Sequence, residues 1–464
     1  MNRKLIEFKE SIKEKKVAVL GIGVSHIPLI KYLAGIGVDV TAFDKSDEGK
    51  LKEVFDDFCG LDIKYSIGED YLKNLKGFDV VFKTPGMRFD VPEILEAQRR
   101  GAQITSEMEV FFELCPAQIF AVTGSDGKTT TTTLIYNMLK EQGYSCWLGG
   151  NIGTPLLDRI DEINETDKVI LELSSFQLHT MTLSPKVAVV TNLAPNHLDM
   201  HKSMEEYVEA KKNIFLHQLP GDKVILNFDN DITREFSKET EGNVVYFSRV
   251  NKIDSGATIN GEMLVYSDGN GVREIVNISD IVIPGVHNIE NYLAAIAAVI
   301  DYVGVDIIKR VATTFKGVEH RIELVRELDG IKFYNDSIAS SPSRTIAGLN
   351  SFKQKVILIA GGYDKKIPYD VMGEVIANKV KCLVLIGQTA PKIEKALLDE
   401  AQKTGNGKDV TIIKCNTMKE AVEKSYKFAK SGDIITLSPA SASFDMFKNF
   451  EERGKQFKEF VNDL

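Results

Sequence analysis

Residues 118–143 read QIFAVTGSDGKTTTTTLIYNMLKEQG, and this stretch specifies a strand, a turn and a helix in succession. The apolar residues 119–122 predict a buried strand, residues 124–127 predict a turn, and the residues from Lys128 onward predict a helix. A glycine-rich turn between a strand and a helix is typical of a phosphate-binding loop, because backbone amides at the helix start face the anion. In such a loop Lys128 supplies positive charge to the phosphates, and the Thr129 hydroxyl can bind Mg²⁺.

The loop departs from the general pattern G-x-x-x-x-G-K-[ST], because Val122 stands at the position of the first glycine. The shorter pattern T-G-x-x-G-K-T-T has an alternative interpretation as a surface turn with an exposed lysine. The strand before it and the helix after it favour a phosphate site. We predict a nucleoside triphosphate site that includes seven consecutive residues: Gly124, Ser125, Asp126, Gly127, Lys128, Thr129 and Thr130.

Strand-like apolar runs alternate with amphipathic helical stretches along the whole chain, which is typical of α/β domains with mostly parallel sheets. At about 150 residues per domain, the length of 464 residues predicts roughly three domains. A strand, glycine turn, helix and strand occupy 16–44, and a second doubly wound pattern occupies 355–441. We expect Rossmann-like domains over residues 1–106 and 318–464, and a central α/β domain with the phosphate loop (P-loop) over residues 107–317.

A second glycine turn, GIGVSH at 21–26, resembles the dinucleotide fingerprint but has His26 where the third glycine belongs. That glycine permits close packing of helix on strand, so its replacement disfavours NAD and an oxidoreductase built on this segment. Backbone amides at the helix start can still meet an anion, which leaves a nucleotide-type ligand or a plain structural turn. Asp44, at the end of the next predicted strand, is placed to bind a ribose hydroxyl or to face solvent.

Composition excludes several classes of protein. Hydrophobic residues make up 43% of the chain and charged residues 27%, as in globular proteins with sizeable cores, and the net charge of −9 disfavours general binding to nucleic acid. Five dispersed cysteines favour free thiols in a reducing compartment. The charged start lacks the core of a signal peptide, and the apolar run at 293–300 is far shorter than the roughly 18 residues of a membrane span. We expect a cytoplasmic protein with no nucleic acid partner and no stable membrane insertion.

Two further segments carry groups that bind metals. Glu172 ends the apolar run KVILE, and in a parallel sheet its carboxylate would lie beside the phosphate loop as a hard oxygen ligand for Mg²⁺. An acid at a helix start, stabilised by the helix dipole, is the alternative. His197 and His201 are four residues apart, but the glutamate of H-E-x-x-H is missing between them, which disfavours a zinc protease.

A set of short motifs extends this pattern from one end of the chain to the other. In order they are GIGVS at 21–25, TPG at 84–86, TGSDGKTT at 123–130, GGNIG at 149–153, LELSSFQL at 171–178, NHLDMH at 196–201, YVEAKKNIF at 207–215, GVHNIEN at 285–291, EHR at 319–321, YNDSIASSP at 334–342, GGYDKK at 361–366 and LSPASASFDMFKNFEERG at 437–454. Together they resemble the Mur ligase family of peptidoglycan synthesis, and within it the members that add D-glutamate.

The resemblance implies an ATP-binding, P-loop ATPase type of ligase of cell wall synthesis, and hence a role in cell shape and division, with ATP, UDP-N-acetylmuramoyl-L-alanine and D-glutamate as small-molecule substrates. We expect this cytoplasmic protein to be a monomer. ATP would phosphorylate the carboxylate of the sugar-linked alanine, and the amino group of D-glutamate would attack the acyl phosphate. An amide, ADP and phosphate result. The family implies that the N-terminal domain binds the UDP-sugar, the central domain ATP, and the C-terminal domain the amino acid.

The resemblance also assigns roles that the residue pattern leaves undecided. The implied ligands of Mg²⁺, of which two ions are expected, are Thr129, Glu172, His197 and Lys211. Lys211 would act as the carbamate formed with CO₂; without the resemblance, it and Lys212 are ordinary solvated helix residues. Further contacts to ATP are implied for Asn151, Asn288, Asn291, Arg321 and Asp336. Turn formation and helix capping are the structural alternatives for the first two of these.

Substrate contacts follow from the same resemblance. Nucleotide-sugar contacts are implied for Val24, Ser25, Asp44 and Gly86. D-glutamate contacts are implied for Ser340, Lys365, Ser443, Phe444 and Phe450, with core packing as the alternative for the last. The family's N-D-S-K-A-T motif is altered here, with Ile338 for the lysine and Ser340 for the threonine, so another group such as Arg344 must supply that charge.

Other functions remain as alternatives. Folylpolyglutamate synthases lack the block that precedes the phosphate loop here, and the D-N-P-R signature of the diaminopimelate- or lysine-adding Mur ligases is not found in this sequence. A ligase specific for L-glutamate would look almost the same. A regulatory GTPase-like switch is disfavoured because such a switch needs no third doubly wound domain.

Overall fold

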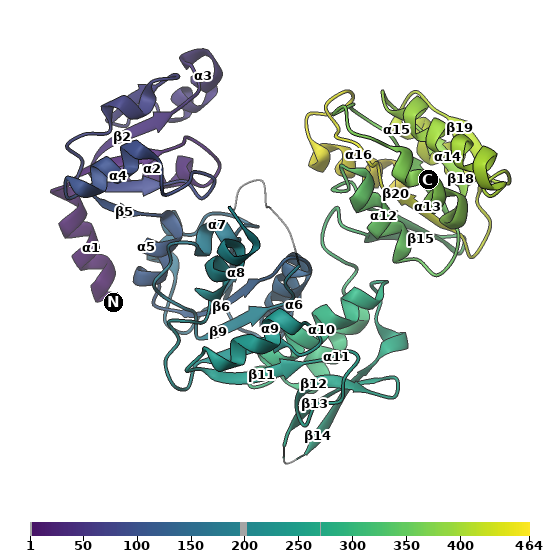
Figure 1. Cartoon of the computed structure of the whole chain (residues 1–464), viewed down its shortest axis with the longest axis horizontal. Helices are drawn as coiled ribbons and strands as arrows, with labels where there is room; N and C mark the ends of the chain where they lie inside the picture. Colours follow the sequence, from purple (N-terminus) through teal and green to yellow (C-terminus); the bar gives the residue numbers. More distant parts are fainter. Residues whose placement is uncertain (1, 195–201, 270) are drawn as a thin grey trace. The chain divides into compact units, whose positions relative to one another are not determined.

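The computed structural model describes residues 2–194, 202–269 and 271–464. These residues form three β-sheets combined with helices, which confirms the predicted α/β class (Figure 1). The chain divides into two compact units, Met1–Val276 with Glu290–Val311 and Asn277–Ile289 with Ala312–Leu464. Within the described ranges, no helix is long and apolar enough to cross a membrane.

The N-terminal sheet has five parallel strands in the order β3-β2-β1-β4-β5. The strands are β1 (Lys16–Leu20), β2 (Asp39–Asp44), β3 (Ile63–Ile67), β4 (Val80–Lys83) and β5 (Gln103–Thr105). The accompanying helices are α1 (Arg3–Lys13), α2 (His26–Gly35), α3 (Glu48–Asp57), η1 (Tyr71–Asn74), α4 (Pro92–Arg99) and α5 (Glu107–Leu114). The strand order reverses between β1 and β4, and open parallel sheets bind ligands in the crevice at such a point.

The central sheet has nine strands in the order β14-β13-β12-β11-β10-β9-β6-β8-β7. They are β6 (Gln118–Thr123), β7 (Cys146–Gly150), β8 (Lys168–Glu172), β9 (Val187–Val190), β10 (Lys223–Asn227), β11 (Asn243–Phe247), β12 (Ser255–Asn260), β13 (Met263–Asp268) and β14 (Val272–Asn277). The strands from β7 to β12 are parallel, and β12 pairs with β13 antiparallel. The helices are α6 (Lys128–Glu141), η2 (Leu157–Glu162), α7 (Ser175–Leu178), α8 (Met204–Lys212), α9 (Asp231–Glu235), η3 (Phe236–Lys238), η4 (Ile278–Asp280), α10 (Val286–Val299) and α11 (Val305–Thr314).

The third sheet has six strands in the order β15-β16-β20-β17-β18-β19, and the β15–β16 pair is antiparallel while the others are parallel. The strands are β15 (Glu323–Leu328), β16 (Ile331–Asn335), β17 (Val356–Ala360), β18 (Val380–Leu385), β19 (Thr411–Lys414) and β20 (Ile434–Leu437). The helices are α12 (Pro342–Asn350), η5 (Asp370–Met372), α13 (Gly373–Lys379), α14 (Ala390–Thr404), α15 (Met418–Phe428) and α16 (Phe450–Asn462).

One continuous apolar cluster joins the N-terminal and central sheets of the first unit. It contains Val19 of β1, Phe111 of α5 and Ala121 of β6, each buried. Lys9 and Tyr32 both reach the carboxylate of Asp161 at the edge of this cluster, at 2.5 and 3.1 Å. The two sheets of the first unit therefore pack on a shared core, and loops from both can contribute to one site.

Candidate active site

The predicted phosphate loop connects β6 to α6, and β6 lies between β8 and β9 in the sheet. Gly127 has φ +79° and packs so closely that a Cβ there would lie 2.3 Å from Oδ1 of Asn291 on α10. Nζ of Lys128 donates to the carbonyl oxygens of Gly124 and Ser125, both at 2.9 Å. The side chain of Lys128 therefore lies along the loop backbone.

Two residues that the sequence did not single out support this loop. Asn192, just beyond β9, accepts from the amide of Asp126 at 3.0 Å through its side-chain oxygen. The hydroxyl of Tyr207 on α8 lies 2.9 Å from Oγ of Ser125, which donates to the carbonyl oxygen of Ala194. Asn192 could have been identified only from the order of the strands, because Asn192 follows β9 and β9 pairs with β6.

Glu172 lies at the end of β8, opposite Val122 of β6 and Gly150 of β7. The alternative of a helix-start acid does not hold, because α7 begins later and is capped by Ser174. Nδ2 of Asn151 donates to Oε1 of Glu172 at 2.7 Å. Oε2 of Glu172 is buried and has no hydrogen-bond partner in the described part of the chain.

Lys211 lies at the end of α8 with only 2% of its surface exposed. Its amine donates to Oγ1 of Thr123 and to the carbonyl oxygen of Gly124, both at 3.0 Å. Burial, and then the positive charge of Lys128, hold the pKa of Lys211 well below its ordinary value. The residue pattern alone predicted that Lys211 is a solvated helix lysine. In the structure it is buried instead, because α8 packs under the phosphate loop. Lys212 pairs with Glu209 and Glu239 and is also largely covered.

The residues around the loop fit a hard divalent cation in part. Oε2 of Glu172 is buried without a hydrogen-bond partner among the described residues, and a cation would stabilise it. Mg²⁺ prefers such carboxylate oxygens as ligands. Among the described residues there is no group of three His, Cys, Asp or Glu side chains that could hold a metal. His197 and His201 lie outside the described residues. A complete ligand set would need the Thr129 hydroxyl or a modified Lys211 in addition to Glu172.

Asn288 and Asn291 both lie on α10, one turn apart. Oδ1 of Asn291 accepts from the hydroxyl of Thr131 at 3.3 Å, which ties α10 to α6 behind the phosphate loop. Asn288 is inside the first turn of α10 and its side-chain amide donates to the carbonyl oxygen of Pro284 at 2.5 Å. A capping residue would have to precede α10, whereas Asn288 lies inside it, so the capping alternative does not hold.

The predicted nucleotide-sugar residues of the N-terminal sheet meet at one edge of it. Val24 is exposed and Ser25 precedes α2, both in the turn after β1. Asp44, at the end of β2, accepts from the amides of Ile22 and Ser46, both at 2.7 Å, so its carboxylate holds the glycine turn. Gly86 follows β4, on the other side of the point where the strand order reverses.

Gly86 lines a cavity between the N-terminal and central parts of the first unit. The lining of this small, partly open cavity consists of Lys83, Pro85, Gly86, Met87, Arg88, Phe89, Phe176, His179 and Thr180. The amine of Lys83 donates to the carbonyl oxygens of Thr84 and Met87, at 3.1 and 2.7 Å. Burial lowers the pKa of Lys83 to about 8. The sequence drew no attention to this lysine, because it ends an ordinary apolar strand.

In the second unit, Asp336 follows β16 and is 4% exposed. Oγ of Ser438 donates to its Oδ2 at 2.8 Å, and burial raises the pKa of the Asp336 carboxyl to about 7. Arg321 lies in the same unit, where its positive charge opposes that rise in pKa. Nη1 of Arg344, which the sequence offered in place of the missing lysine, donates to the carbonyl oxygen of Ile338 at 3.3 Å.

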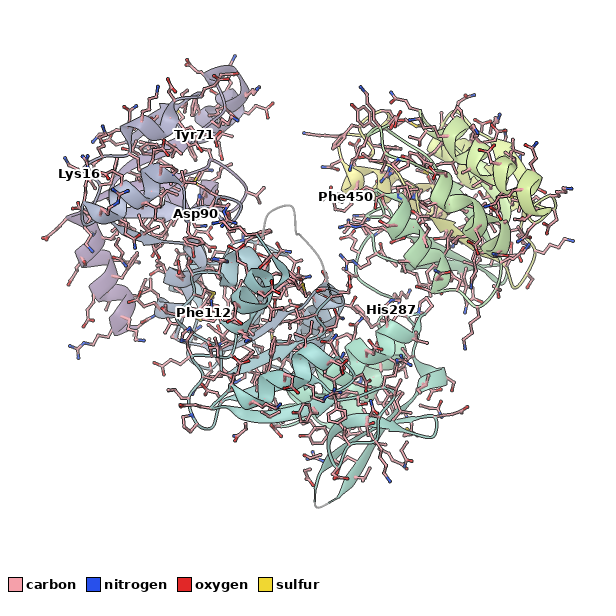
Figure 2. All side chains as sticks on the ribbon, in the orientation of Figure 1. Lys16, Tyr71, Asp90, Phe112, His287 and Phe450 are labelled. Atoms are coloured by element: carbon pink, nitrogen blue, oxygen red, sulfur yellow. The ribbon has the colours of Figure 1, made fainter. Side chains whose placement is uncertain are left out.

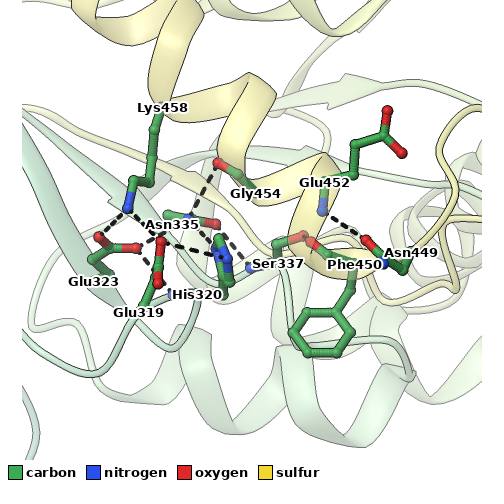
Figure 3. Close-up of polar contacts among 10 residues, drawn as sticks. All are labelled: Glu319, His320, Glu323, Asn335, Ser337, Asn449, Phe450, Glu452, Gly454 and Lys458. Carbon is green, nitrogen blue, oxygen red and sulfur yellow. Dashed lines mark hydrogen bonds and ion pairs between the residues drawn. The ribbon is translucent and has the colours of Figure 1, made fainter. Parts of the chain in front are cut away.

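A polar cluster holds the segment around Arg321 and Asp336 in place (Figure 3). Nδ2 of Asn335 lies 2.9 Å from Nδ1 of His320 and donates to Glu323 at 3.1 Å. His320 has φ +62° and packs so tightly that a Cβ on Gly454 would lie 2.2 Å from its Nδ1. Lys458 of α16 donates to both Glu319 and Glu323. These contacts attach α16 to residues 319–323 and to Asn335.

The residues predicted for D-glutamate follow three adjacent strands of the third sheet. Ser340 follows β16, Lys365 follows β17, and Ser443 and Phe444 follow β20. The rings of Tyr363 and Phe444 meet edge to face with centroids 6.0 Å apart, and Phe444 is 63% exposed. Phe450 begins α16 and is half-buried, so the core-packing alternative holds for it only in part.

The pattern N-K-x-D, which guanine-binding switches use, does occur in the chain, at 251–254. It lies in the turn between β11 and β12, where Nδ2 of Asn251 donates to Oδ1 of Asp229 at 2.7 Å. Asp229 also accepts from Ser248 and from the amide of Arg249. These contacts give the asparagine a structural role in joining the ends of β10 and β11.

Three family models match successive parts of the chain. They are described as "Mur ligase MurD-like, N-terminal domain" over residues 15–106, "Mur ligase middle domain" over 122–299 and "Mur ligase, glutamate ligase domain" over 320–441. The first match contains the predicted nucleotide-sugar residues, the second contains the phosphate loop, and the third contains Ser340 and Lys365 but ends before Ser443.

Full-length relatives agree with these matches. The chain is 71% identical over 464 residues, 100% of both chains, to the UDP-N-acetylmuramoylalanine--D-glutamate ligase of Acetivibrio thermocellus. It is 62% identical, again over 100% of both chains, to the protein of the same name from Ruminiclostridium cellulolyticum. The solved structure of a UDP-N-acetylmuramate-alanine ligase from Thermotoga maritima, 19% identical, aligns with TM-score 0.58 over 97% of this chain and 99% of its own. At 19% identity, the similarity to the Thermotoga maritima structure shows a shared fold only.

Proposed function

This chain belongs to the Mur ligase family, and we propose that it joins D-glutamate to UDP-N-acetylmuramoyl-L-alanine at the expense of ATP. The observation that carries this function is the 71% identity, over the full length of both chains, to a relative of that name. The reaction is a ligation of peptidoglycan synthesis. It transfers the terminal phosphoryl group of ATP to a carboxylate and then exchanges phosphate for the amino group of D-glutamate.

Lys128 is proposed to hold the triphosphate together with the amides of the loop. Phosphoryl transfer depends on positioning and on neutralising charge more than on covalent chemistry by the protein. The amine of Lys128 lies within hydrogen-bond distance of two loop carbonyl oxygens, which supports its assignment to the same loop whose amides would bind the phosphates. Asn291 supports the loop from behind, through Thr131 and its close contact with Gly127.

Glu172 and Lys211 are proposed to bind Mg²⁺ with Thr129 and His197. Bound Mg²⁺ would neutralise the charge that develops on the phosphoryl oxygens. The carbamate at Lys211 has a physical basis, because burial lowers the pKa of the amine and so favours the neutral form, which is the form that adds to CO₂. The addition of CO₂ to the neutral amine releases one proton and leaves a carbamate anion beside Lys128. Asn151 orients the carboxylate of Glu172.

The remaining groups are proposed to bind the other two substrates. The edge formed by Val24, Ser25, Asp44 and Gly86 would bind the UDP-sugar, which assigns that substrate to residues 1–106. Residues 107–317 would bind ATP, and residues 318–464 would bind D-glutamate through Ser340, Lys365, Ser443, Phe444 and Phe450. Lys365 provides the cation that an amino acid with two carboxylates requires. Arg321 and Asp336 would contact ATP from the third sheet, and Asn288 from α10.

The experiment that tests the function measures phosphate release from ATP by the purified full chain with UDP-N-acetylmuramoyl-L-alanine. D-glutamate, L-glutamate or no amino acid is added, and the amide product is identified by mass. Release that requires D-glutamate supports the proposal, and equal release in all three arms contradicts it. Size-exclusion chromatography under assay conditions tests whether the enzyme acts as a monomer, and fractionation of cells tests whether it acts in the cytoplasm.

A pair of lysine variants tests the role of the phosphate loop. Lys128→Ala is expected to abolish phosphate release, because the loop loses its positive charge. Lys140→Ala is the matched control, since Lys140 lies in the last turn of the same helix, where its amine donates to the exposed hydroxyl of Tyr136. Normal turnover by Lys128→Ala would remove the phosphate loop from the mechanism while leaving the overall reaction open to test.

A further inference from the structure

We infer that Arg88 is a positioning residue that connects the loop carrying Gly86 to the helix carrying Lys211. It acts through an ion cluster of four residues, called here the Arg88 cluster: Arg88, Asp90, Lys202 and Glu206. The inference rests on the proposed function, because it assigns the consequence of this connection to binding of the UDP-sugar. None of the four residues was singled out by the sequence motifs.

The Arg88 cluster alternates positive and negative charges across two segments far apart in the sequence. Arg88 holds the carboxylate of Asp90 with two hydrogen bonds, from Nε at 2.8 Å and from Nη2 at 3.0 Å. Nη2 of Arg88 also reaches Oε1 of Glu206 at 3.1 Å, and Nζ of Lys202 reaches Oδ2 of Asp90 at 2.7 Å. The backbone amide of Lys202 donates to Glu206. Figure 2 labels Asp90 on the side of the N-terminal sheet that faces α7 and α8.

The cluster is better placed than an ordinary surface ion pair. The side chains of Arg88, Asp90 and Glu206 are 28%, 29% and 19% exposed, so solvent screens them only in part. The two-pronged contact of a guanidinium with a carboxylate fixes geometry as well as charge. A lysine at position 88 could keep the charge but not this geometry.

An aromatic contact next to the cluster ties the same loop to α7. The ring of Phe89 stacks on His179 with centroids 4.7 Å apart and planes 29° apart. Arg88, Phe89 and His179 all line the cavity that Gly86 also lines. The Arg88 cluster therefore forms part of the wall of the space beside the proposed UDP-sugar residue.

Helix α8 carries the connection onward to the phosphate loop. Glu206 lies in its first turn, where Ser203 caps the helix, and Tyr207 contacts Ser125 of the loop. Lys211 lies five residues beyond Glu206, about 7–8 Å along the helix axis, and contacts Gly124. A shift of the loop 84–90 against α8 would therefore reach both the proposed sugar site and the proposed metal site.

The test compares Arg88→Ala, Arg88→Lys and Glu206→Gln in the full chain, with Arg100→Ala as control. Arg100 is an exposed arginine directly after α4, where its Nε pairs with Glu96 of that helix. We measure the KM for UDP-N-acetylmuramoyl-L-alanine, the KM for ATP, kcat and the thermal midpoint of each variant. Hydrogen exchange of residues 204–212 is measured with and without UDP-N-acetylmuramoyl-L-alanine, so one readout needs no turnover.

Arg88→Ala is expected to raise the KM for the UDP-sugar about tenfold, because one or two charge-assisted hydrogen bonds are lost. The KM for ATP is expected to change less than about twofold. Arg88→Lys is expected to recover part of the loss. The UDP-sugar should slow exchange in residues 204–212 of the unmodified chain and not of Arg88→Ala. If Arg88→Ala does not fold, Glu206→Gln carries the same test, because it keeps the shape of the side chain.

Equal effects of Arg88→Ala and Arg100→Ala on the KM for the UDP-sugar would overturn the inference, as would equal rises in both KM values. Exchange in 204–212 that ignores the UDP-sugar in the unmodified chain would also overturn it. An unmodified chain that forms no amide product contradicts the proposed function instead. The hydrogen exchange of residues 204–212 then still tests the inference, because that measurement needs no turnover.

Discussion

Asn151 donates a hydrogen bond of 2.7 Å from its side-chain amide to Oε1 of Glu172, and its backbone amide donates to the carbonyl oxygen of Glu172, also at 2.7 Å. The turn after β7 is thereby tied twice to the end of β8. The bond to Oε1 sets the orientation of the carboxylate. It leaves Oε2 buried, with no partner among the residues that the structure describes, as the oxygen available to a cation.

Asn151→Ala is expected to raise the Mg²⁺ concentration needed for half-maximal phosphate release by roughly 10–100-fold, because residues that orient a metal ligand have effects of that size. The measurement is phosphate release against Mg²⁺ concentration at saturating ATP. Asn164→Ala is the control, because Asn164 is an exposed residue whose side-chain amide donates to the carbonyl oxygen of nearby Glu162. An unchanged Mg²⁺ requirement in Asn151→Ala would show that Asn151 does not orient a metal ligand.

Lys211→Ala is expected to abolish turnover, and short carboxylates such as formate or acetate should restore part of it by supplying the anion of the carbamate. Phosphate release is measured with increasing carboxylate at constant ionic strength. Lys212→Ala, which removes the neighbouring lysine and its pairs with Glu209 and Glu239, should keep most of its activity and gain nothing from carboxylates. Full activity of Lys211→Ala, or inactivity without any rescue, would contradict the carbamate.

Gly127→Ala is expected to raise the KM for ATP by at least about tenfold. The residue has φ +79°, and the new Cβ would lie 2.3 Å from Oδ1 of Asn291, so the loop must shift. Gly143→Ala provides the control, because Gly143 has φ +104° with no atom within 4 Å of the added Cβ. That variant should lose about 1–2 kcal/mol of stability and keep its KM for ATP. Equal KM values for both variants would refute close packing of the loop on α10.

Glu107→Gln is expected to stabilise the protein at pH 8 but much less at pH 5. Burial raises the pKa of Glu107 to about 7, so the folded chain binds this proton more tightly than the unfolded chain. The stability of the unmodified chain therefore falls as the pH rises from about 4.5 to 7, by roughly 2–3 kcal/mol between pH 5 and 8. Urea unfolding at both pH values measures the difference.

Glu113→Gln is the control for that experiment, because Glu113 lies on the same helix and is exposed. Its effect on the free energy of unfolding should be the same at both pH values. If Glu107→Gln also shows no dependence on pH, the Glu107 carboxyl titrates normally in the folded chain and the account of its burial is wrong.

Local sequence was sufficient to predict the α/β class and the strand, loop and helix around Lys128. These features depend on residues adjacent in the chain, namely an apolar run, glycines that permit unusual backbone angles, and a helix start that attracts an anion. The position of Glu172 at a strand end was predicted for the same reason. The roles of Arg321, Lys211 and the D-glutamate residues came from resemblance to a family, because no periodicity or spacing marks them.

The amino-acid order thus specified which segments become strands and helices and where a glycine turn joins a strand to a helix, because those properties depend on near neighbours. Folding in three dimensions alone set the burial of Lys211, the support of Ser125 by Tyr207 and the contact of Arg88 with Glu206. Each of these joins residues far apart in the chain, and each depends on how strands are ordered in a sheet and which helix packs under which loop. Burial then changes the chemistry, because an amine removed from water loses its proton more readily than the same amine on an exposed helix.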